Sequence, residues 1–273
     1  MSLFTENSAL IVAHPDDEIL WFSSVLEKVS SIVLCYVDSP YESDLAEARR
    51  EVIRHYPLNN MVSLDVCEAG SFDAVDWSIT PNKTEYGITI ANPAVEVRYE
   101  KSYRELCERL RPLLCNFKNI ITHNPWGEYG HPDHVQVYRV VKFLQSEFQY
   151  DIWYSNCCAN RSAGLALETI SGLNGRCEVL PTNDALVDQF MSLYQKYGAW
   201  TWYDDFEWFE EDVFISDASY EDESRSHGKM KLNMLSLDLP ITPAQPVQKR
   251  PVKWIDKIFR RLNNPIRTSR SDV

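Results

Sequence analysis

The sequence predicts an α/β fold, with a Rossmann-like, mostly parallel sheet, helices on both faces and a functional site at the carboxyl ends of the strands. Short apolar runs of strand length alternate with longer segments of helical spacing, an order typical of parallel strands joined by crossover helices. Two polar segments, residues 14–18 and 123–134, each follow a predicted strand. Ligands of such sheets bind outside the carboxyl ends of the strands, where both segments are expected.

Strands and helices are predicted in alternation over the first 155 residues. Helices are predicted where helix formers or apolar residues recur at helical spacing, and Pro132 suits the first turn of the last helix. The helices are expected at residues 16–28, 45–56, 95–116 and 132–146. The strands are expected at residues 9–14, 31–37, 61–66, 118–122 and 150–155.

The composition is that of a globular chain. Its 273 residues allow one large α/β domain, and 44% of them are hydrophobic and 25% charged. The longest apolar runs have strand length and are too short to cross a bilayer. The first residues lack a basic and apolar leader, and the seven cysteines are scattered without a CxxC pair. We therefore expect a cytoplasmic protein in a reducing compartment.

Charge divides the chain into an acidic body and a basic end. The net charge is −13, yet the last 25 residues hold eight Lys or Arg and only two Asp. An acidic body is a poor surface for nucleic acid, so no nucleic-acid partner is expected. We expect one domain over residues 1–235, a proline-containing linker over 236–251 and a basic amphipathic tail over 252–273. The tail either contacts a membrane peripherally or docks on this body or a neighbouring subunit, which leaves a homo-oligomer open.

Each polar segment holds imidazole and carboxylate groups beside a proline that stiffens the turn. The first is HPDDE at residues 14–18, and the second ends in GHPDH at residues 130–134. A lone histidine more often satisfies a local hydrogen bond, and paired aspartates often cap a helix. Two such segments at one sheet edge instead predict a metal or acid–base site, because catalytic zinc binds three imidazole or carboxylate ligands and keeps one position open for water.

Both motifs resemble those of the PIG-L/LmbE-like family of zinc-dependent N-acetylglucosamine deacetylases. HPDDE follows the first strand, and ITHNPWGEYGHPDH at residues 121–134 is similar to the second family signature. The resemblance covers residues 8–154 and implies that the domain over 1–235 is a deacetylase. The implied reaction is hydrolysis of the acetamide of an N-acetylhexosamine (GlcNAc-like) unit in a glycan, glycolipid or glycoside, which releases acetate. The expected partner is thus an N-acetylated amino sugar or its conjugate.

The resemblance also implies a role for each matching residue. Asp16 would be the general base that deprotonates the attacking water. His131 would stabilise the oxyanion or protonate the leaving amine, and Asp133 would orient this imidazole and favour its charged form. One Zn²⁺ ion per chain would be held by His14, Asp17 and His134.

Other residues are candidates for substrate binding. Arg49 and Arg50 lie where family members use an arginine to hold the substrate, although both also suit a solvated helix face. His123 would either orient a ligand from behind or satisfy its own loop. Residues 197–214 hold eight aromatics and six acids, and rings such as Trp202 would stack on a sugar or pack in the core. At residues 21–24, WFSS replaces the family's glycine pair, which would change helix packing or narrow the pocket and leaves the substrate open.

Several alternatives stay open on the sequence. Some relatives of the family are zinc-dependent hydratases, and a non-catalytic carbohydrate-binding relative would use the same fold for binding alone. Two histidines and one carboxylate also bind non-haem iron, so another divalent metal is an alternative to zinc. A nucleotide-binding domain is disfavoured, because no GxGxxG or P-loop follows any predicted strand.

Overall fold

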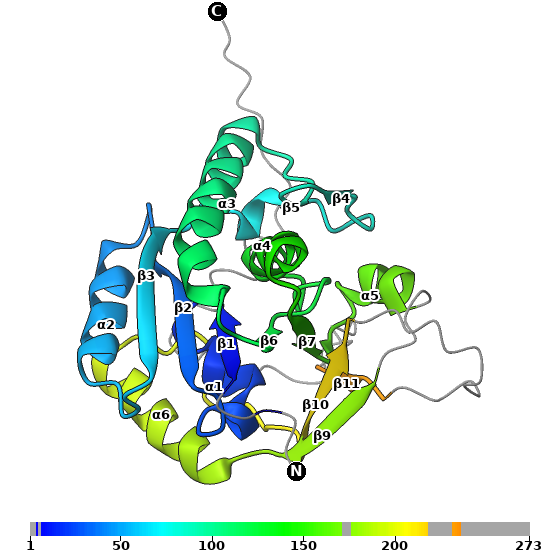
Figure 1. Cartoon of the computed structure of the whole chain (residues 1–273). Coiled ribbons are helices and arrows are strands. Elements are labelled where there is room, and N and C mark those ends of the chain that lie inside the picture. Colours follow the sequence, from blue (N-terminus) through cyan, green and yellow to red (C-terminus); the bar gives the residue numbers. More distant parts are fainter. Residues whose placement is uncertain (1–3, 5–6, 171–175, 218–230, 236–273) are drawn as a thin grey trace, which may run out of the picture.

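The computed structural model describes residues 4, 7–170, 176–217 and 231–235 (Figure 1). The expected linker and basic tail, residues 236–273, lie outside the described residues. Within the described part of the chain, no helix is both long and apolar enough to span a bilayer. In chain order the elements are β1 (Ser8–Val12), α1 (Asp17–Trp21), η1 (Ser23–Val25), β2 (Ser31–Asp38), α2 (Ser43–Arg54), β3 (Met61–Cys67), η2 (Phe72–Ala74), β4 (Lys83–Thr84), β5 (Gly87–Ile88), α3 (Pro93–Leu114), β6 (Asn119–Thr122), α4 (Pro132–Phe148), β7 (Asp151–Ser155), β8 (Cys157–Cys158), α5 (Ala163–Ile170), β9 (Cys177–Pro181), α6 (Asp184–Tyr197), β10 (Glu211–Ser216) and β11 (Asn233–Met234).

Seven strands form one sheet in the order β3-β2-β1-β6-β7-β10-β9. The first five strands in this order, β3-β2-β1-β6-β7, pair in parallel. In contrast, β10 pairs antiparallel with both β7 and β9. Each of the five predicted strands forms within two residues of its expected bounds. The predicted mostly parallel sheet is therefore confirmed.

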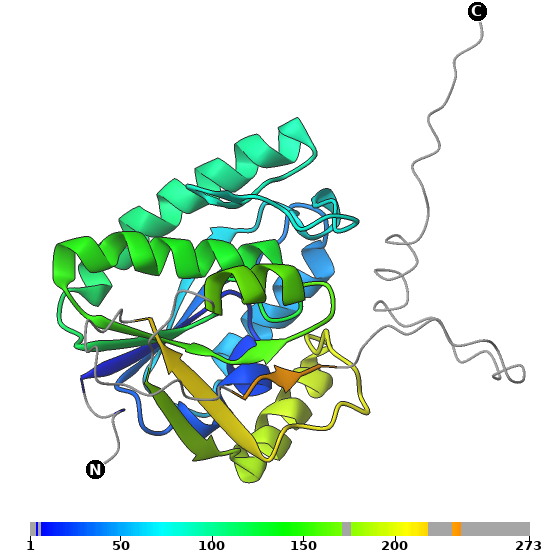
Figure 2. The same cartoon turned by 90° about the vertical axis from the view of Figure 1, so that its right-hand side faces the viewer.

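Helices cover both faces of this sheet (Figures 1 and 2). Successive strand residues face opposite sides, so Ala9 and Ile11 of β1 pack in a core cluster with α3 and α4. Leu10 and Val12 pack in the second cluster with α1 and α6. A fully buried Leu, Ile or Val side chain contributes about 1.5–3 kcal/mol, so the central strand that carries the site is stabilised from both faces. The prediction of helices on both faces is confirmed.

β1 and β6 bring the two polar motifs to the same edge of the sheet. The strands lie side by side and run parallel, with Ser8 paired to Asn119 and Ile11 to Thr122. Their carboxyl ends therefore lie together. The segment after β1 leads into α1 and the segment after β6 leads into α4, so the motifs meet where the sequence predicts a site.

The predicted helix over residues 16–28 is shorter in the structure. α1 ends at Trp21, and Phe22 leaves the helical region with φ −141° and ψ 19°. The backbone N–H of Ser24 donates to the Asp212 carboxylate at 3.0 Å instead of continuing the helix. Because this partner comes from a strand near the other end of the domain, local helix propensity does not reveal the break.

The aromatic and acidic segment over residues 197–214 connects α6 to β10. After Gly198, which adopts a left-handed φ of +74°, the chain passes along α1. Thr201 donates its backbone N–H to the Asp16 carboxylate at 3.2 Å. Trp208 donates its indole N–H to the Ile19 carbonyl oxygen at 2.9 Å. We call residues 199–210 the wall segment, because they cover α1 beside the polar motifs.

Candidate metal centre

The segment after β1 turns sharply at Asp16. This residue has φ 102°, a conformation that non-glycine residues rarely adopt and that costs free energy. Asp17 then begins α1, and its carboxylate accepts the His14 backbone N–H at 2.8 Å. The turn directs the side chains of His14, Asp16 and Asp17 toward one cavity.

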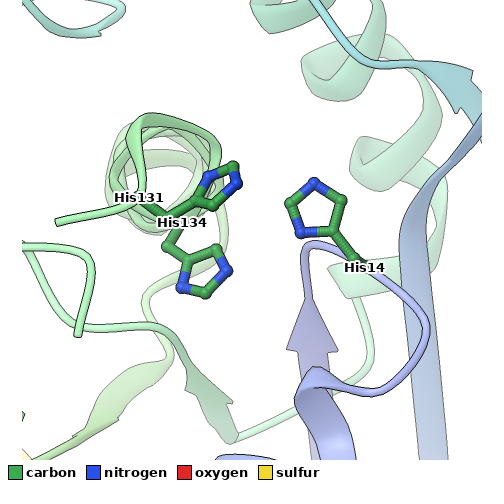
Figure 3. Close-up of side chains that lie close together, drawn as sticks. All are labelled: His14, His131 and His134. Atoms are coloured by element: carbon green, nitrogen blue, oxygen red, sulfur yellow. The ribbon is translucent and has the colours of Figure 1, made fainter. Parts of the chain in front are cut away.

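The segment after β6 is a tight loop that ends at the first turn of α4. Gly127 has φ +69°, and a Cβ atom there would lie 2.5 Å from the His131 carbonyl oxygen, so glycine is required. His131 is the N-cap of α4, and Pro132 begins the helix. His131 and His134 therefore project from the helix start toward His14 (Figure 3), with ring centroids 4.8 Å and 5.7 Å from that of His14.

Asp17 lies between the two histidines with which it was expected to bind zinc. Its Oδ2 is 3.3 Å from His14 Nδ1, and its Oδ1 is 3.2 Å from His134 Nε2. Trp21 Nε1 donates to the same Oδ1 at 3.1 Å. Burial alone would raise the pKa of Asp17, but His134 and His123 hold it well below its usual range. The structure thus brings His14 and His134 together around the ionised carboxylate of Asp17.

Distance alone offers several sets of metal ligands. Among the described residues, three groups place their donor atoms within 4.8 Å of one another, and the expected set of His14, Asp17 and His134 is not itself one of them. The groups are His14–His131–His134, Asp17–His123–His134 and His14–Glu68–Asp133. Because His134 occurs in two groups, its hydrogen bonds and those of its neighbours matter for choosing between them.

One nitrogen of His134 faces the Asp17 carboxylate and is suited to bind a cation. Its Nδ1 contacts Glu128 Oε2 at 2.8 Å, and burial would raise the pKa of Glu128, but His123 and His134 lower it to about 2. Since this ionised carboxylate only accepts, Nδ1 carries the proton. Nε2 is buried and has no hydrogen-bond partner among the described residues, which is costly unless a cation occupies it. This donor set fits a divalent ion such as zinc, with Glu128 as the outer carboxylate.

In His123 and in His131, one ring nitrogen already accepts a backbone hydrogen bond. His123 Nε2 accepts the Ala13 backbone N–H at 2.8 Å. His131 Nδ1 accepts the Asp133 backbone N–H at 3.1 Å, so the neutral ring carries its proton on Nε2. Burial, together with His134 and His14, lowers the pKa of His131 well below its usual range, which favours the neutral ring. Neither ring has a free lone pair like that of His134.

The Asp133 carboxylate is placed differently from the expectation. It lies 3.4 Å from His14 Nε2 and accepts the Ser71 hydroxyl at 2.7 Å, whereas the backbone of Asp133 is what contacts His131. Burial lowers the pKa of His14, but the hydrogen bonds to Asp133 and Asp17 raise it well above its usual range. In the structure, therefore, the Asp133 carboxylate contacts and orients His14 rather than His131.

Asp16 is held from the wall segment. Thr201 donates to Asp16 Oδ2 twice, from its backbone N–H at 3.2 Å and from its hydroxyl at 2.5 Å. Burial and the adjacent Asp17 carboxylate raise the pKa of Asp16, although the Thr201 hydroxyl opposes this. The two adjacent aspartates thus have opposite pKa shifts because they face different partners, an arrangement typical of acid–base sites.

A cavity of about 760 Å³ opens onto this cluster. Arg49 and Trp202, two of the candidates for substrate binding, also line it. Arg49 is 5% exposed, its Nε and Nη1 atoms have no hydrogen-bond partner among the described residues, and Nη1 lies 3.7 Å from the Glu68 carboxylate. Arg50 and His123 do not line the cavity: Arg50 pairs with Asp38, and His123 is fully buried. The residues of the two motifs that line it are His14, Asp16, Asp17, Tyr129, His131 and Asp133.

Sequence reasoning missed three residues of the site. Glu68 follows β3 and lies 3.4 Å from His14 Nε2 and 3.7 Å from Arg49 Nη1; its place after a strand of the same parallel sheet was a usable signal. Glu128 lies inside the second motif, where a carboxylate before two histidines could have indicated an outer partner. Thr201 is 185 residues from Asp16, and no local pattern indicates that contact.

Comparisons with known proteins agree with the geometry. A family model described as PIG-L, GlcNAc-PI de-N-acetylase, matches residues 9–144, about half of the chain. An uncharacterized protein of Acanthamoeba polyphaga mimivirus is 24% identical over 166 residues. That match covers 58% of this chain and 66% of the relative, just under two thirds of the relative's length.

Solved structures of deacetylases are similar to this chain. The zinc-inhibited form of teicoplanin deacetylase Orf2 is 11% identical, with a TM-score of 0.50 over 79% of this chain and 99% of that chain. A deacetylase–teicoplanin complex is 12% identical, with a TM-score of 0.48 over 77% and 97% of the two chains. At 11% identity, the similarity to the Orf2 structure shows a shared fold only. The family match, in contrast, spans both motifs and the whole cluster from His14 to His134, and the chain belongs to the PIG-L family.

Proposed function

We propose that this protein hydrolyses the acetamide of an N-acetylhexosamine (GlcNAc-like) unit in a glycan, glycolipid or glycoside and releases acetate. The observation that carries the proposal is the buried Nε2 of His134, which has no hydrogen-bond partner among the described residues and lies 3.2 Å from the Asp17 carboxylate. Asp16 lines the cavity beside this pair. Membership of a family described as GlcNAc-PI de-N-acetylases supports this reaction.

The proposed cofactor is one zinc ion per chain, held by His14, Asp17 and His134. His134 offers Nε2 because Nδ1 is committed to Glu128, and Asp17 contacts the imidazoles of both partners. The occupied nitrogens of His123 and His131 support this choice over the two donor groups that contain those residues. When bound, zinc acidifies a water molecule and polarises the acetamide carbonyl.

Asp16 is the proposed general base. Thr201 fixes its carboxylate at the cavity wall, where Asp16 can take a proton from the attacking water as the new C–O bond forms. The C–N bond then breaks, and the leaving nitrogen must gain a proton. Delivery of the proton held by Asp16 to that nitrogen balances the reaction, and acetate and the free amine remain.

His131 is the proposed donor to the oxyanion. Its Nδ1 accepts a backbone N–H, so Nε2–H of the neutral ring is the group that can donate to the developing negative charge. A neutral imidazole that already accepts at Nδ1 is poorly suited to protonate an amine. Of the two roles that the family resemblance implies, these hydrogen bonds therefore support the first.

Metal analysis combined with acetate release tests the proposal. Purified protein is assayed for bound metal by mass spectrometry, and acetate is measured with a panel of N-acetylhexosamine glycosides and nucleotide sugars. We expect about one zinc per chain and acetate release that a chelator abolishes and added zinc restores. Protein that binds no metal after zinc is added would contradict the proposed site, and bound zinc without acetate from any panel member would contradict the proposed reaction.

A further inference from the structure

A second cavity adjoins the first. Its volume is about 990 Å³, beside about 760 Å³ for the cavity at the metal centre. Ligand sites usually occupy about 300–1,000 Å³, so each cavity has the size of a complete site and the two together exceed the needs of one sugar unit. The residues that line both are Glu42, Asp44, Leu45, Thr201 and Trp202.

The second cavity lies between the start of α2 and the wall segment. Among the described residues that line it, none is Lys, Arg or His. The indole nitrogens of Trp200 and Trp202 are buried and have no hydrogen-bond partner within the described part of the chain. Its aromatic and acidic lining consists of Tyr197, Trp200, Trp202, Glu42, Asp44 and Asp204.

This lining matches a sugar and opposes a phosphate. Aromatic rings pack against the apolar C–H face of a pyranose. Ionised carboxylates only accept hydrogen bonds, so they pair with hydroxyl or ammonium donors. A phosphate is both anionic and an acceptor, so it is repelled by these carboxylates and finds no cation among the described lining residues.

Because of their position, these carboxylates would contact the group that is attached to the reacting sugar. Glu42 and Asp44 line both cavities, so a group that extends from the first cavity into the second passes them. Asp44 is exposed in the first turn of α2, and Asp204 lies farther along the second cavity. Within the first cavity the single arginine of the lining, Arg49, already lies 3.7 Å from Glu68.

We propose that the second cavity is a subsite for a neutral or cationic sugar attached to the N-acetylhexosamine unit, and that Glu42, Asp44 and Asp204 select against phosphate-bearing conjugates. This inference rests on the deacetylase function proposed above. It separates the chain from the substrate named in its family description, GlcNAc-PI, whose PI group carries a phosphate.

Three probes that share the same reacting sugar test the subsite. They are the methyl glycoside of N-acetylglucosamine, a disaccharide in which N-acetylglucosamine is linked to a neutral hexose, and N-acetylglucosamine 1-phosphate. Acetate release gives kcat/KM for each, and calorimetry with the Asp16→Asn variant gives Kd without turnover. We expect the disaccharide to exceed the methyl glycoside, and the 1-phosphate to fall below it by about tenfold or more in both measurements.

A charge variant identifies the cause of the discrimination. Asp44→Asn keeps the side-chain size and removes one charge, so the gap between the 1-phosphate and the methyl glycoside should narrow severalfold, as it should at high ionic strength. Glu108→Gln is the matched control, because Glu108 is exposed on α3 and lines neither cavity. The control should leave the gap unchanged.

The outcomes separate this inference from the function on which it rests. A 1-phosphate that binds or reacts as well as the disaccharide overturns the subsite, even when acetate release establishes the deacetylase. No acetate from any probe overturns the reaction, while the order of the Kd values still decides the subsite. An unchanged gap in Asp44→Asn overturns the assignment of the selection to these carboxylates.

Discussion

The two motif loops and the wall segment meet in one cavity but are built differently. The loops at residues 14–18 and 123–134 follow adjacent parallel strands, and their functional side chains are almost all buried and joined by short hydrogen bonds. The wall segment follows α6, keeps many of its side chains partly exposed, and is rich in rings and acids. The loops hold the groups proposed for metal binding and proton transfer, whereas the wall holds those proposed for substrate selection.

This difference separates the expected effects of substitutions. Changes in the loops should alter metal content or kcat with little change in substrate preference. Changes in the wall should alter KM and preference while metal content stays the same. Thr201 is the exception, because it belongs to the wall and contacts Asp16.

The largest effect is expected for Asp16→Asn. Asparagine keeps the size of the side chain but cannot take a proton, so kcat should fall by about 10²–10⁴-fold, the usual contribution of a general base. Bound zinc should stay at the wild-type level, because Asp16 is outside the proposed ligand set. Steady-state acetate release and metal analysis of the same preparation check both statements, and wild-type turnover would remove Asp16 from the base role.

A smaller effect is expected for Glu128→Gln. The amide lacks the negative charge that holds His134 Nδ1–H at 2.8 Å, and loss of such an outer carboxylate typically weakens metal affinity by about 10–100-fold. Competition with a chromophoric chelator measures the zinc Kd. His134→Ala is the reference for full loss of a ligand, and Glu128→Gln protein with unchanged zinc affinity would contradict the orienting role.

The sequence was sufficient for the parts of the site that depend on neighbouring residues. A strand followed by HPDDE locates His14, Asp16 and Asp17, and GHPDH at a helix start locates His131 and His134. Parallel strand order then brings these loops together, because β1 and β6 are adjacent in the sheet. Local pattern and topology therefore predicted the sheet and the cluster of histidine and aspartate side chains at its edge.

Contacts between distant segments were beyond the reach of local patterns. The expected helix over residues 16–28 ends early because Ser24 bonds to Asp212, and the Asp133 carboxylate contacts His14 rather than its neighbour His131. Arg49 and Arg50 are adjacent, yet only the helix orientation in the fold determines that Arg49 faces the cavity. Each of these outcomes depends on tertiary packing, which overrides local propensity.

Trp202→Ala tests the wall as a substrate contact. Loss of the ring from both cavities should raise KM by about tenfold or more with a sugar substrate, and zinc content should not change. Tyr203→Ala is the control, since Tyr203 belongs to the same segment, is 39% exposed and lines neither cavity. A fall in kcat with constant KM would instead indicate that Trp202 helps to position Asp17. Its ring lies 5.5 Å from that of Trp21, which donates a hydrogen bond to Asp17.

Thr201→Val examines the one link between the two regions. Valine has nearly the shape of threonine but lacks the hydroxyl that donates to Asp16, and loss of one hydrogen bond to a charged group should lower kcat by about tenfold. The backbone N–H of residue 201 still donates to Asp16, so the effect should be smaller than that of Asp16→Asn. Thr201→Ser restores the hydroxyl and should restore kcat. If valine changes KM and serine does not reverse it, Thr201 belongs with the substrate wall alone, and proton transfer at Asp16 is independent of that region.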